Sequence, residues 1–198
     1  ITITCAHAIV KYLIAQKILI NGKKEPLFPG VFGIFGHGNV ACLGQALEES
    51  QNELPTYRGH HEQNMALTGS GYARAKRRQQ IFVATSSVGQ GATNIVTAAA
   101  VAMSNRIPIL FLPSDTYANR MPDPVLQQVE HFNNPGVTAN DAFKPVTRYF
   151  DRITRPEQII QSFPAAIQTM LDPADCGPAC ISLSQDIQGQ TFDYPEEF

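Results

Sequence analysis

The sequence predicts an α/β fold of three layers, in which a mainly parallel six-stranded sheet is covered by helices on both faces. Short apolar runs alternate along the chain with segments of helical periodicity. The runs are apolar without interruption, which is typical of strands that are buried on both faces of a sheet. Glycine-rich turns at 36–39 and 86–91 follow two of these runs and lead into helices. This alternation favours parallel strands joined by crossover helices.

The N-terminal part of the chain predicts a helix followed by a loop. Over residues 4–20, Ala8, Ile9 and Leu13 fall on one face at helical spacing, and Thr4 is the expected N-cap. Residues 21–29 contain a glycine and two prolines and predict a loop. The six expected strands cover residues 31–35, 54–58, 81–85, 107–112, 149–153 and 179–183.

Helices are expected between these strands, and one long loop interrupts the pattern. The first of these helices ends near Glu49 and the second covers residues 60–77. The third ends near Ser104, and the fourth begins near Pro156 with Thr154 as its cap. The segment 113–142 is rich in Pro, Asn and Asp and predicts a loop with one helical turn near 125–129. We expect one domain over residues 1–187 and a linker at 188–198 that leads to a domain outside this chain.

Composition excludes several classes of partner. Hydrophobic residues make up 43% of the 198 residues, and the formal net charge of −2 leaves no basic surface for nucleic acid or an anionic membrane. The apolar runs are too short to cross a bilayer, and we see no secretory signal. The four cysteines form no C-x-x-C pair, and no histidine lies at zinc-ligand spacing from them. We therefore expect no metal site in this chain and a reducing, cytoplasmic location.

Ligands of parallel sheets bind at the carboxyl ends of the strands, where the turn 36–39 is expected. The segment 36–41 reads G-x-G-x-x-A, which is a dinucleotide-binding pattern when it lies between a strand and a helix. A dinucleotide site also requires an acidic residue at the end of the next strand, but that strand ends in Tyr57, Arg58 and Gly59. Three interpretations stay open for the turn: close helix–strand packing, a ligand other than a dinucleotide, and a dinucleotide.

The helix expected at 60–77 is rich in small residues, including Gly69 and Gly71. Glycine costs about 1 kcal/mol inside a helix, so a close backbone approach in the core or at a subunit interface is expected here. Glu62 lies in its first turn, where a carboxylate is favoured by the helix dipole whatever its function. His60 and His61 do not form an H-E-x-x-H pattern, so a zinc protease is excluded.

A set of motifs in fixed order makes this chain resemble the thiamin-diphosphate-dependent superfamily that includes acetolactate synthase and pyruvate decarboxylase. The order covers nearly the whole chain and comprises His61-Glu62-Gln63, Gly71-Tyr72-Ala73-Arg74, Gly91-Ala92-Thr93-Asn94 and the lysine-containing segment 144–149. A finer resemblance is to the trihydroxycyclohexane-1,2-dione hydrolases of inositol catabolism. It rests on the segments 35–40, 85–89, 122–130, 154–158, 172–175 and 185–189. Gln90 departs from this branch, in which we expect proline.

The resemblance implies that the chain is the pyrimidine-binding domain of such an enzyme. It assigns Glu62 the catalytic hydrogen bond to N1′ of the aminopyrimidine ring, through which C2 of the thiazolium loses its proton. Sharing that proton requires a carboxyl that is neutral part of the time, which burial against an apolar helix face favours. Further cofactor contacts are implied for Gln90 and Asn94 and for the turn residues Gly36, His37 and Gly38. Asp115 aligns with a family glutamine near the active site.

The resemblance also implies a reaction and partners. The substrate would be a cyclic diketone whose ring C–C bond is hydrolysed to give 5-deoxyglucuronate. Magnesium and the diphosphate would be bound by a G-D-G…N segment, which these 198 residues lack. We therefore expect a homodimer or tetramer in which the cofactor lies between this domain and the diphosphate-binding domain of a neighbouring subunit. This chain alone would then be inactive.

Other functions stay open. The same scaffold carries synthases, decarboxylases and carboligases, and a non-catalytic domain could retain the fold without the reaction. A dinucleotide-binding module is the remaining alternative.

Overall fold

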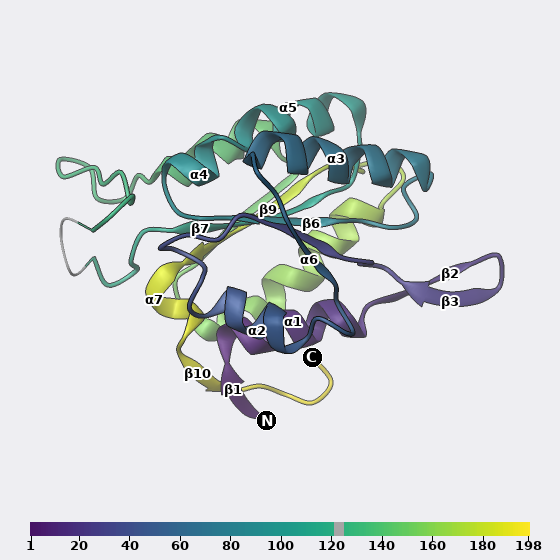
Figure 1. Ribbon diagram of the computed structural model, residues 1–198, viewed down its shortest axis with the longest axis horizontal. Coiled ribbons are helices and arrows are strands. Elements are labelled where there is room, and N and C mark those ends of the chain that lie inside the picture. The colour runs from purple at the N-terminus through teal and green to yellow at the C-terminus, as the bar shows by residue number, and fades with distance from the viewer. Residues whose placement is uncertain (121–124) are drawn as a thin grey trace.

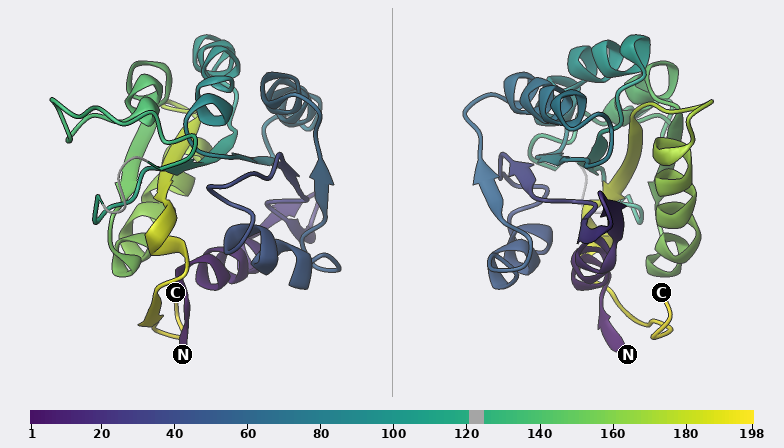
Figure 2. Two further views of the ribbon diagram at one scale, coloured as in Figure 1. Left: turned by 60° about the vertical axis from the view of Figure 1, so that its left-hand side comes forward. Right: turned by 90° about the vertical axis from the view of Figure 1, so that its right-hand side faces the viewer.

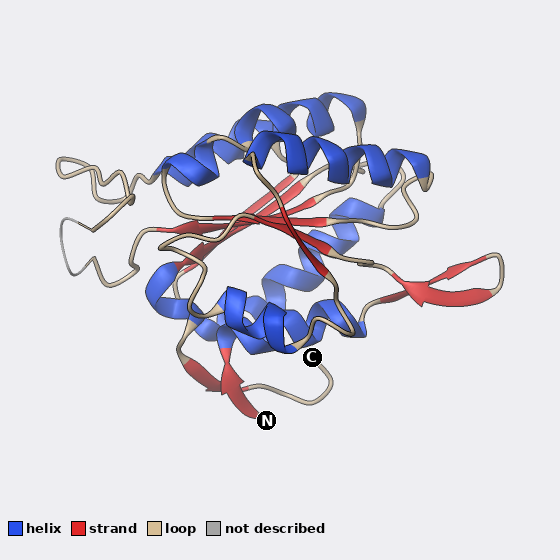
Figure 3. Ribbon diagram, in the orientation of Figure 1, coloured by secondary structure: helices blue, strands red, loops and turns tan. Residues whose placement is uncertain are grey.

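The predicted three-layer fold is confirmed by the computed structural model, which describes residues 1–120 and 125–198 (Figures 1 and 3). Residues 122–124, part of the finer resemblance, lie outside the described residues. The central sheet is wholly parallel and has the strand order β5-β4-β6-β7-β9-β8. Its strands are β4 (Val31–Gly33), β5 (Thr56–Arg58), β6 (Val83–Ser86), β7 (Leu110–Asp115), β8 (Tyr149–Ile153) and β9 (Ala179–Ser184).

Helices pack on both faces of this sheet, as Figure 2 shows in two further views. Strands β6, β7 and β9 are buried at every position, which explains why their sequences show no polar alternation. One face is covered by α1 (Cys5–Ala15), α2 (Leu43–Glu49) and α6 (Ile159–Leu171). The other is covered by α3 (Glu62–Ala75), α4 (Gln90–Thr93), α5 (Val96–Asn105) and the 3-10 helix η1 (Ala139–Val146).

A hairpin replaces the end of the first predicted helix and the start of the predicted loop. Helix α1 is capped by Thr4, as expected, but ends at Ala15. Strands β2 (Lys17–Ile20) and β3 (Lys23–Pro26) then pair antiparallel and project from the domain (Figure 1). Asn21 and Gly22 both have positive φ, the conformation of a two-residue hairpin turn. The prediction was wrong here because the apolar run at residues 18–20 was interpreted as the end of the helix, whereas exposed and partly buried residues alternate in β2.

Smaller corrections concern element ends. The helix predicted to end near Ser104 is divided into α4 and α5 at 94–95. No helical turn forms at 125–129, because Gln127 and Val129 have positive φ. The helix that was predicted to have Thr154 as its N-cap begins with the 3-10 turn η2 (Pro156–Gln158), whose N-cap is Arg155.

The last residues pack against the domain. Strand β10 (Thr191–Asp193) pairs antiparallel with β1 (Thr2–Thr4), and the Tyr194 hydroxyl donates to the Pro156 carbonyl at 3.0 Å. The Phe198 ring stacks on Tyr12 with 4.6 Å between ring centroids. The segment expected as a linker is therefore ordered on the domain surface. Its role as a linker and the domain boundary at 187 stay predictions.

A buried ion pair network ties the carboxyl end of β7 to β8 and η1. Asp115 is 1% exposed and accepts from Arg152 Nε at 2.7 Å. Arg152 Nη2 donates to Asp141 Oδ1, also at 2.7 Å, and Lys144 pairs with the same oxygen. Burial acts to raise the pKa of Asp141, but the Thr138 N–H, Arg152 and Lys144 together hold that pKa below its ordinary value of 3.8. Asp141 therefore stabilises the fold in its charged form.

We predict that Asp141→Asn lowers the free energy of unfolding by about 1–2 kcal/mol near neutral pH, because Arg152 and Lys144 lose a partner. The stabilisation from a carboxyl of lowered pKa is present above its unfolded-state pKa and is lost as the pH falls through the folded-state pKa. The difference between variant and wild type should thus shrink as the pH falls below 3.8 and through the folded-state pKa. Urea unfolding of both proteins across this range measures it. Asp175→Asn, which removes an exposed partner of Arg148, is the control and should change stability by less than about 1 kcal/mol. An equal loss in both variants at neutral pH would contradict the network.

Candidate functional site

An open groove lies at the carboxyl ends of β4 and β6, where the sequence predicts ligand binding. It is bounded by the turn after β4, the start of α3, the start of α4, and the loop that follows β7. The residues that line it are Ile34, Phe35, Gly36, Glu62, Ser87, Gln90, Gly91, Thr93, Asn94 and Gln127. Four of the predicted cofactor residues, Gly36, Glu62, Gln90 and Asn94, are thus brought together in one groove.

Glu62 is held in this groove by a hydrogen bond from Asn94, the residue that ends α4. Glu62 is the first residue of α3, and its Oε2 accepts from Asn94 Nδ2 at 2.7 Å. Gly91 lies against the same carboxylate, where a Cβ would be 3.4 Å from Oε1. Within the described residues Oε1 has no hydrogen-bond partner. Glu62 is half-buried, so this chain supplies only part of the apolar enclosure that the sequence analysis expected for it.

The turn 36–39 is organised internally by Asn39, which is 1% exposed. Its Oδ1 accepts from the Gly36 N–H at 3.0 Å, and its Nδ2 donates to Thr85 Oγ1 at 3.2 Å. Asn39 therefore fixes the turn to β6. This gives Asn39 a structural role that its position in the G-x-G-x-x-A pattern did not predict.

Gly38 packs under the turn rather than into the groove. Its N–H donates to Ser87 Oγ at 3.3 Å, and its carbonyl accepts from Ser114 Oγ and from Gln188 Nε2. A Cβ on Gly38 would be 2.7 Å from Ser114. The Gly38 N–H is therefore not free for a pyrophosphate, and the glycine is required for close packing. This favours the packing interpretation of the turn over a dinucleotide site.

His37 is exposed at the tip of the turn, and its carbonyl accepts from Gln185 Nε2 at 2.9 Å. Neither His37 nor Gly38 lines the groove. Their roles as cofactor contacts stay predictions. Asp115 is likewise turned into the buried ion pair network instead of the groove.

Among the groove residues to which the sequence analysis assigned no role, Ser87 and Gln127 contact each other. Ser87 Oγ donates to Gln127 Oε1 at 3.1 Å, which joins the turn after β6 to the loop after β7. Ser87 could have been identified because it directly follows a strand. Gln127 lies in a long loop with no periodicity, so no local signal marks it.

Gly89 fixes this loop beside the groove. Its φ is +68°, and a Cβ there would overlap the Gln127 carbonyl oxygen. Glycine is therefore required for two independent reasons, the left-handed backbone and the contact with the loop.

Within the described residues no group of three or more His, Cys, Asp or Glu side chains is arranged to hold a metal ion. Among these residues no helix has the length and apolar character needed to cross a membrane. The four cysteines are free thiols, and burial raises the pKa of Cys5 to about 12.

Comparison with known proteins decides the family. Residues 27–134 match the family model described as thiamine pyrophosphate enzyme, N-terminal TPP binding domain. The chain belongs to this family. Thiamine pyrophosphate is thiamin diphosphate, so the predicted resemblance is confirmed.

Similarity over the whole of this chain is found with proteins named 3D-(3,5/4)-trihydroxycyclohexane-1,2-dione hydrolase. The chain is 48% identical over 198 residues to the 3D-(3,5/4)-trihydroxycyclohexane-1,2-dione hydrolase of Listeria monocytogenes serotype 4b (strain F2365). It is 50% identical to the protein of that name from Bacillus velezensis and 49% identical to that from Bacillus subtilis (strain 168). In each comparison all of this chain is covered, but it spans only 31% of the relative's length.

We predict that Gly89→Ala destabilises this thiamine pyrophosphate enzyme domain by about 2 kcal/mol or more, because it combines a strained backbone with a clash against Gln127. Urea unfolding measures the loss. Gly71→Ala is the matched control, since Gly71 lies within α3 with no atom within 4 Å of its added Cβ. That variant should gain up to about 1 kcal/mol. A neutral Gly89→Ala would show that the loop is not held where the structure places it.

Proposed function

We propose that this chain is the pyrimidine-binding domain of a thiamin-diphosphate-dependent C–C hydrolase that opens 3D-trihydroxycyclohexane-1,2-dione to 5-deoxyglucuronate. The observation that carries the proposal is the Glu62 carboxylate, which is oriented by Asn94 in a groove at the carboxyl edge of the sheet. The choice of reaction is supported by the names of relatives that are 48–50% identical across all of this chain.

The groove residues fit the aminopyrimidine end of the cofactor. A flat ring with a basic nitrogen requires one acidic partner and a slot without bulky side chains. Glu62 Oε1 supplies the acidic partner, Gly91 leaves space beside it, and Phe35 and Ile34 form an apolar wall. When bound, thiamin diphosphate supplies the carbanion chemistry that C–C cleavage requires.

Within this proposal Asn94 and Glu62 act as a pair. The Asn94 amide donates to Oε2 and leaves Oε1 without a partner among the described residues, so Oε1 would be the oxygen that meets the ring. Glu62 would hold a proton between Oε1 and ring atom N1′, and Asn94 would keep the carboxyl plane in line for that exchange. Gln90 and Gly36 would limit how the ring lies.

The proposal includes partners beyond this chain. Magnesium and the diphosphate would be held by a separate domain of a neighbouring subunit, in a cytoplasmic homodimer or tetramer. This chain alone would be inactive, because the cofactor site would be only half present. A sister synthase, decarboxylase or carboligase is the alternative to the hydrolase.

We predict that Glu62→Gln slows hydrogen–deuterium exchange at C2 of thiamin diphosphate bound to the full-length protein by about 100-fold or more. The amide cannot share a proton with N1′ as the carboxyl can. NMR of quenched samples measures the exchange rate, and cofactor binding is measured in parallel.

Glu53→Gln is the control, because Glu53 is an exposed carboxylate outside the groove. It should exchange at the wild-type rate. Equal rates in wild type and Glu62→Gln, with cofactor bound to both, would contradict the proposed role and leave Glu62 as a carboxylate that only stabilises its helix.

Product analysis separates the hydrolase from its alternatives. The full-length protein should convert the cyclic dione to an open-chain acid with the uptake of one water, and it should leave pyruvate unchanged. Formation of acetolactate or acetaldehyde from pyruvate would instead identify a synthase or decarboxylase. Mass spectrometry of reactions in ¹⁸O water records both.

A further inference from the structure

A cavity of about 470 Å³ lies at the amino edge of the sheet, opposite the groove that contains Glu62. It is formed where α3, α5 and α6 end and before β6, β7 and β9 begin, near the base of the β2–β3 hairpin (Figure 1). Among the described residues, its lining includes the three arginines Arg77, Arg78 and Arg106 together with the carboxylate of Asp172. Positive side chains thus outnumber negative ones here, although the chain as a whole has a net charge of −2.

Hydrogen bonds place two of the guanidinium groups beside the loop that joins α6 to β9. Arg78 Nε donates to the Arg106 carbonyl at 2.8 Å, and the Cys176 thiol donates to the same oxygen at 3.5 Å. Arg106 Nη1 donates to the Ala174 carbonyl at 3.1 Å. Both guanidinium groups are therefore held next to residues 174–176, of which Cys176 lines the cavity.

The Cys176 thiol responds to these charges. Burial raises its pKa, whereas the positive charges of Arg78, Arg106 and Arg148 act to lower it. Because the pKa stays above its ordinary value of 9.0, the thiol is neutral near pH 7. It therefore does not repel an anion in the cavity.

Most of the donor capacity of the three arginines is not used by the fold. Arg78 Nη2 donates to the Asn105 carbonyl at 3.4 Å, an arrangement that stabilises the C-terminus of α5. Among the described residues, Arg78 Nη1 and both Nε and Nη2 of Arg106 have no partner, and the side chain of Arg77 has none at all. Since a guanidinium carries five N–H donors, many of them are free for a ligand.

The backbone at these arginines is left-handed. Its φ is +54° at Arg77, +64° at Arg78 and +52° at Arg106. Glycine is usual in this conformation at the end of a helix, because it has no Cβ to be strained. Left-handed residues also occur elsewhere in the chain, so strain alone does not mark a site. Here, however, all three positions carry the same cationic side chain and line one cavity, which indicates that the side chains have a function.

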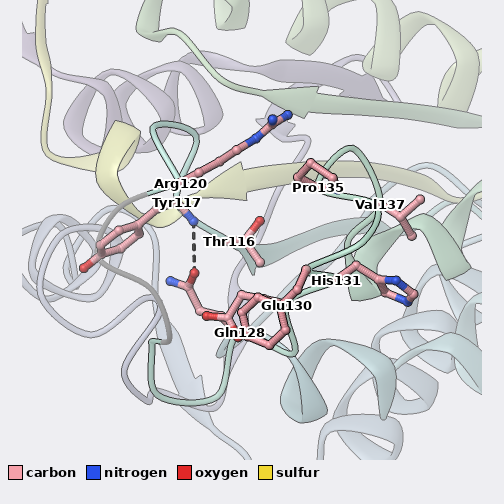
Figure 4. Close-up of a pocket in the computed structure, with 9 residues that line it drawn as sticks. Thr116, Tyr117, Arg120, Gln128, Glu130, His131, Pro135 and Val137 are labelled. Carbon is pink, nitrogen blue, oxygen red and sulfur yellow. Dashed lines mark hydrogen bonds between the residues drawn. The ribbon is translucent and has the colours of Figure 1, made fainter.

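A second cavity, which follows β7, lacks this convergence of charge (Figure 4). The Arg120 guanidinium is directed away from Gln128 and Glu130. The Gln128 amide is used by the fold, since its Oε1 accepts from the Tyr117 N–H and its Nε2 donates to Gln185 Oε1, both at 3.1 Å. The cavity at the amino edge is therefore the stronger candidate for a ligand site.

Net charge alone does not determine what this cavity binds. The C-terminal ends of α3, α5 and α6 each carry about half a negative charge, which together with Asp172 offsets most of the charge of the three arginines. Binding must therefore depend on directed hydrogen bonds from the guanidinium forks. Three forks offer more donors than the two oxygens of a carboxylate accept, whereas a phosphate group presents three terminal oxygens.

An apolar wall beside the arginines completes the lining. It consists of Ile18, Leu171 and Pro173, and it suits a small organic group attached to the phosphate. We propose that this cavity binds a phosphate monoester. The site lies at the opposite edge of the sheet from Glu62, so its ligand is separate from the proposed cofactor.

Isothermal titration calorimetry with phenyl phosphate tests the site in full-length protein saturated with thiamin diphosphate and magnesium. Saturation keeps the cofactor's own phosphate site filled. Wild type should bind phenyl phosphate more tightly than inorganic phosphate, because the phenyl ring covers the apolar wall. Arg77→Leu should weaken binding of phenyl phosphate about tenfold or more, since it removes charge-assisted hydrogen bonds but no contact that the fold uses.

Two further variants give matched comparisons. Arg74→Leu removes an exposed arginine in the last turn of α3 that does not line the cavity, so it should bind like wild type. Asp172→Asn removes the carboxylate from the lining and should tighten binding about threefold. The asparagine retains an oxygen that can accept from the Ala174 N–H, as Asp172 does at 2.7 Å.

Several outcomes overturn the site. These are an absence of saturable binding to the cofactor-saturated wild type, equal affinities in Arg77→Leu and Arg74→Leu, and equal affinities of wild type for phenyl phosphate and inorganic phosphate. Weaker binding in Asp172→Asn would also contradict it. Thermal unfolding identifies a variant that fails to fold, and if this is Arg77→Leu, the direction of the change in Asp172→Asn decides.

Discussion

The close approach of the turn 36–39 to β7 constrains the whole carboxyl edge of the sheet. No side chain fits at Gly38, and three surrounding segments each contribute a polar group to its peptide: Ser87 after β6, Ser114 on β7 and Gln188 on the short helix α7 (Gln185–Gln188). Their hydrogen bonds are buried, so breaking one leaves an unpaired polar group out of reach of water. The turn is therefore fixed by the sheet itself, and one wall of the groove follows from it.

Small residues bring the opposite wall into place. Helix α3 lies close to the sheet because Gly69 has no side chain, and a Cβ there would be 3.0 Å from Ile109 and 3.2 Å from Phe82. The glycine costs about 1 kcal/mol within a helix, which the closer packing offsets. Because α3 and α4 both begin at the carboxyl edge, their first turns meet there, and Asn94 reaches the Glu62 carboxylate.

Local sequence pattern predicted the parts of the fold that depend on burial alone. The uninterrupted apolar runs predicted the central strands β4, β6, β7 and β9, while the predicted strands β5 and β8 carry polar residues. The resemblance placed Glu62, Asn94, Gln90 and Gly36 in one site, where the structure also brings them together. Pairings between distant residues were not predicted, such as β1 with β10 and Asp115 with Arg152, since neither partner carries a local signal of the other. The β2–β3 hairpin was missed for a different reason. Its Asn-Gly turn was a local signal of a hairpin, but the residues before it were interpreted as helical.

Charge determines which end of the cofactor this chain can hold. The groove is lined by one carboxylate and several amide or apolar groups, with no lysine or arginine among its residues. A diphosphate requires cations or a metal ion to offset its charge, and Glu62 beside it would be repulsive. The aminopyrimidine ring has the opposite requirement, an acidic partner and a slot without side chains. The groove thus suits the pyrimidine end of the cofactor, and the proposed function must assign the diphosphate end to residues outside this chain, which spans 31% of the length of its relatives.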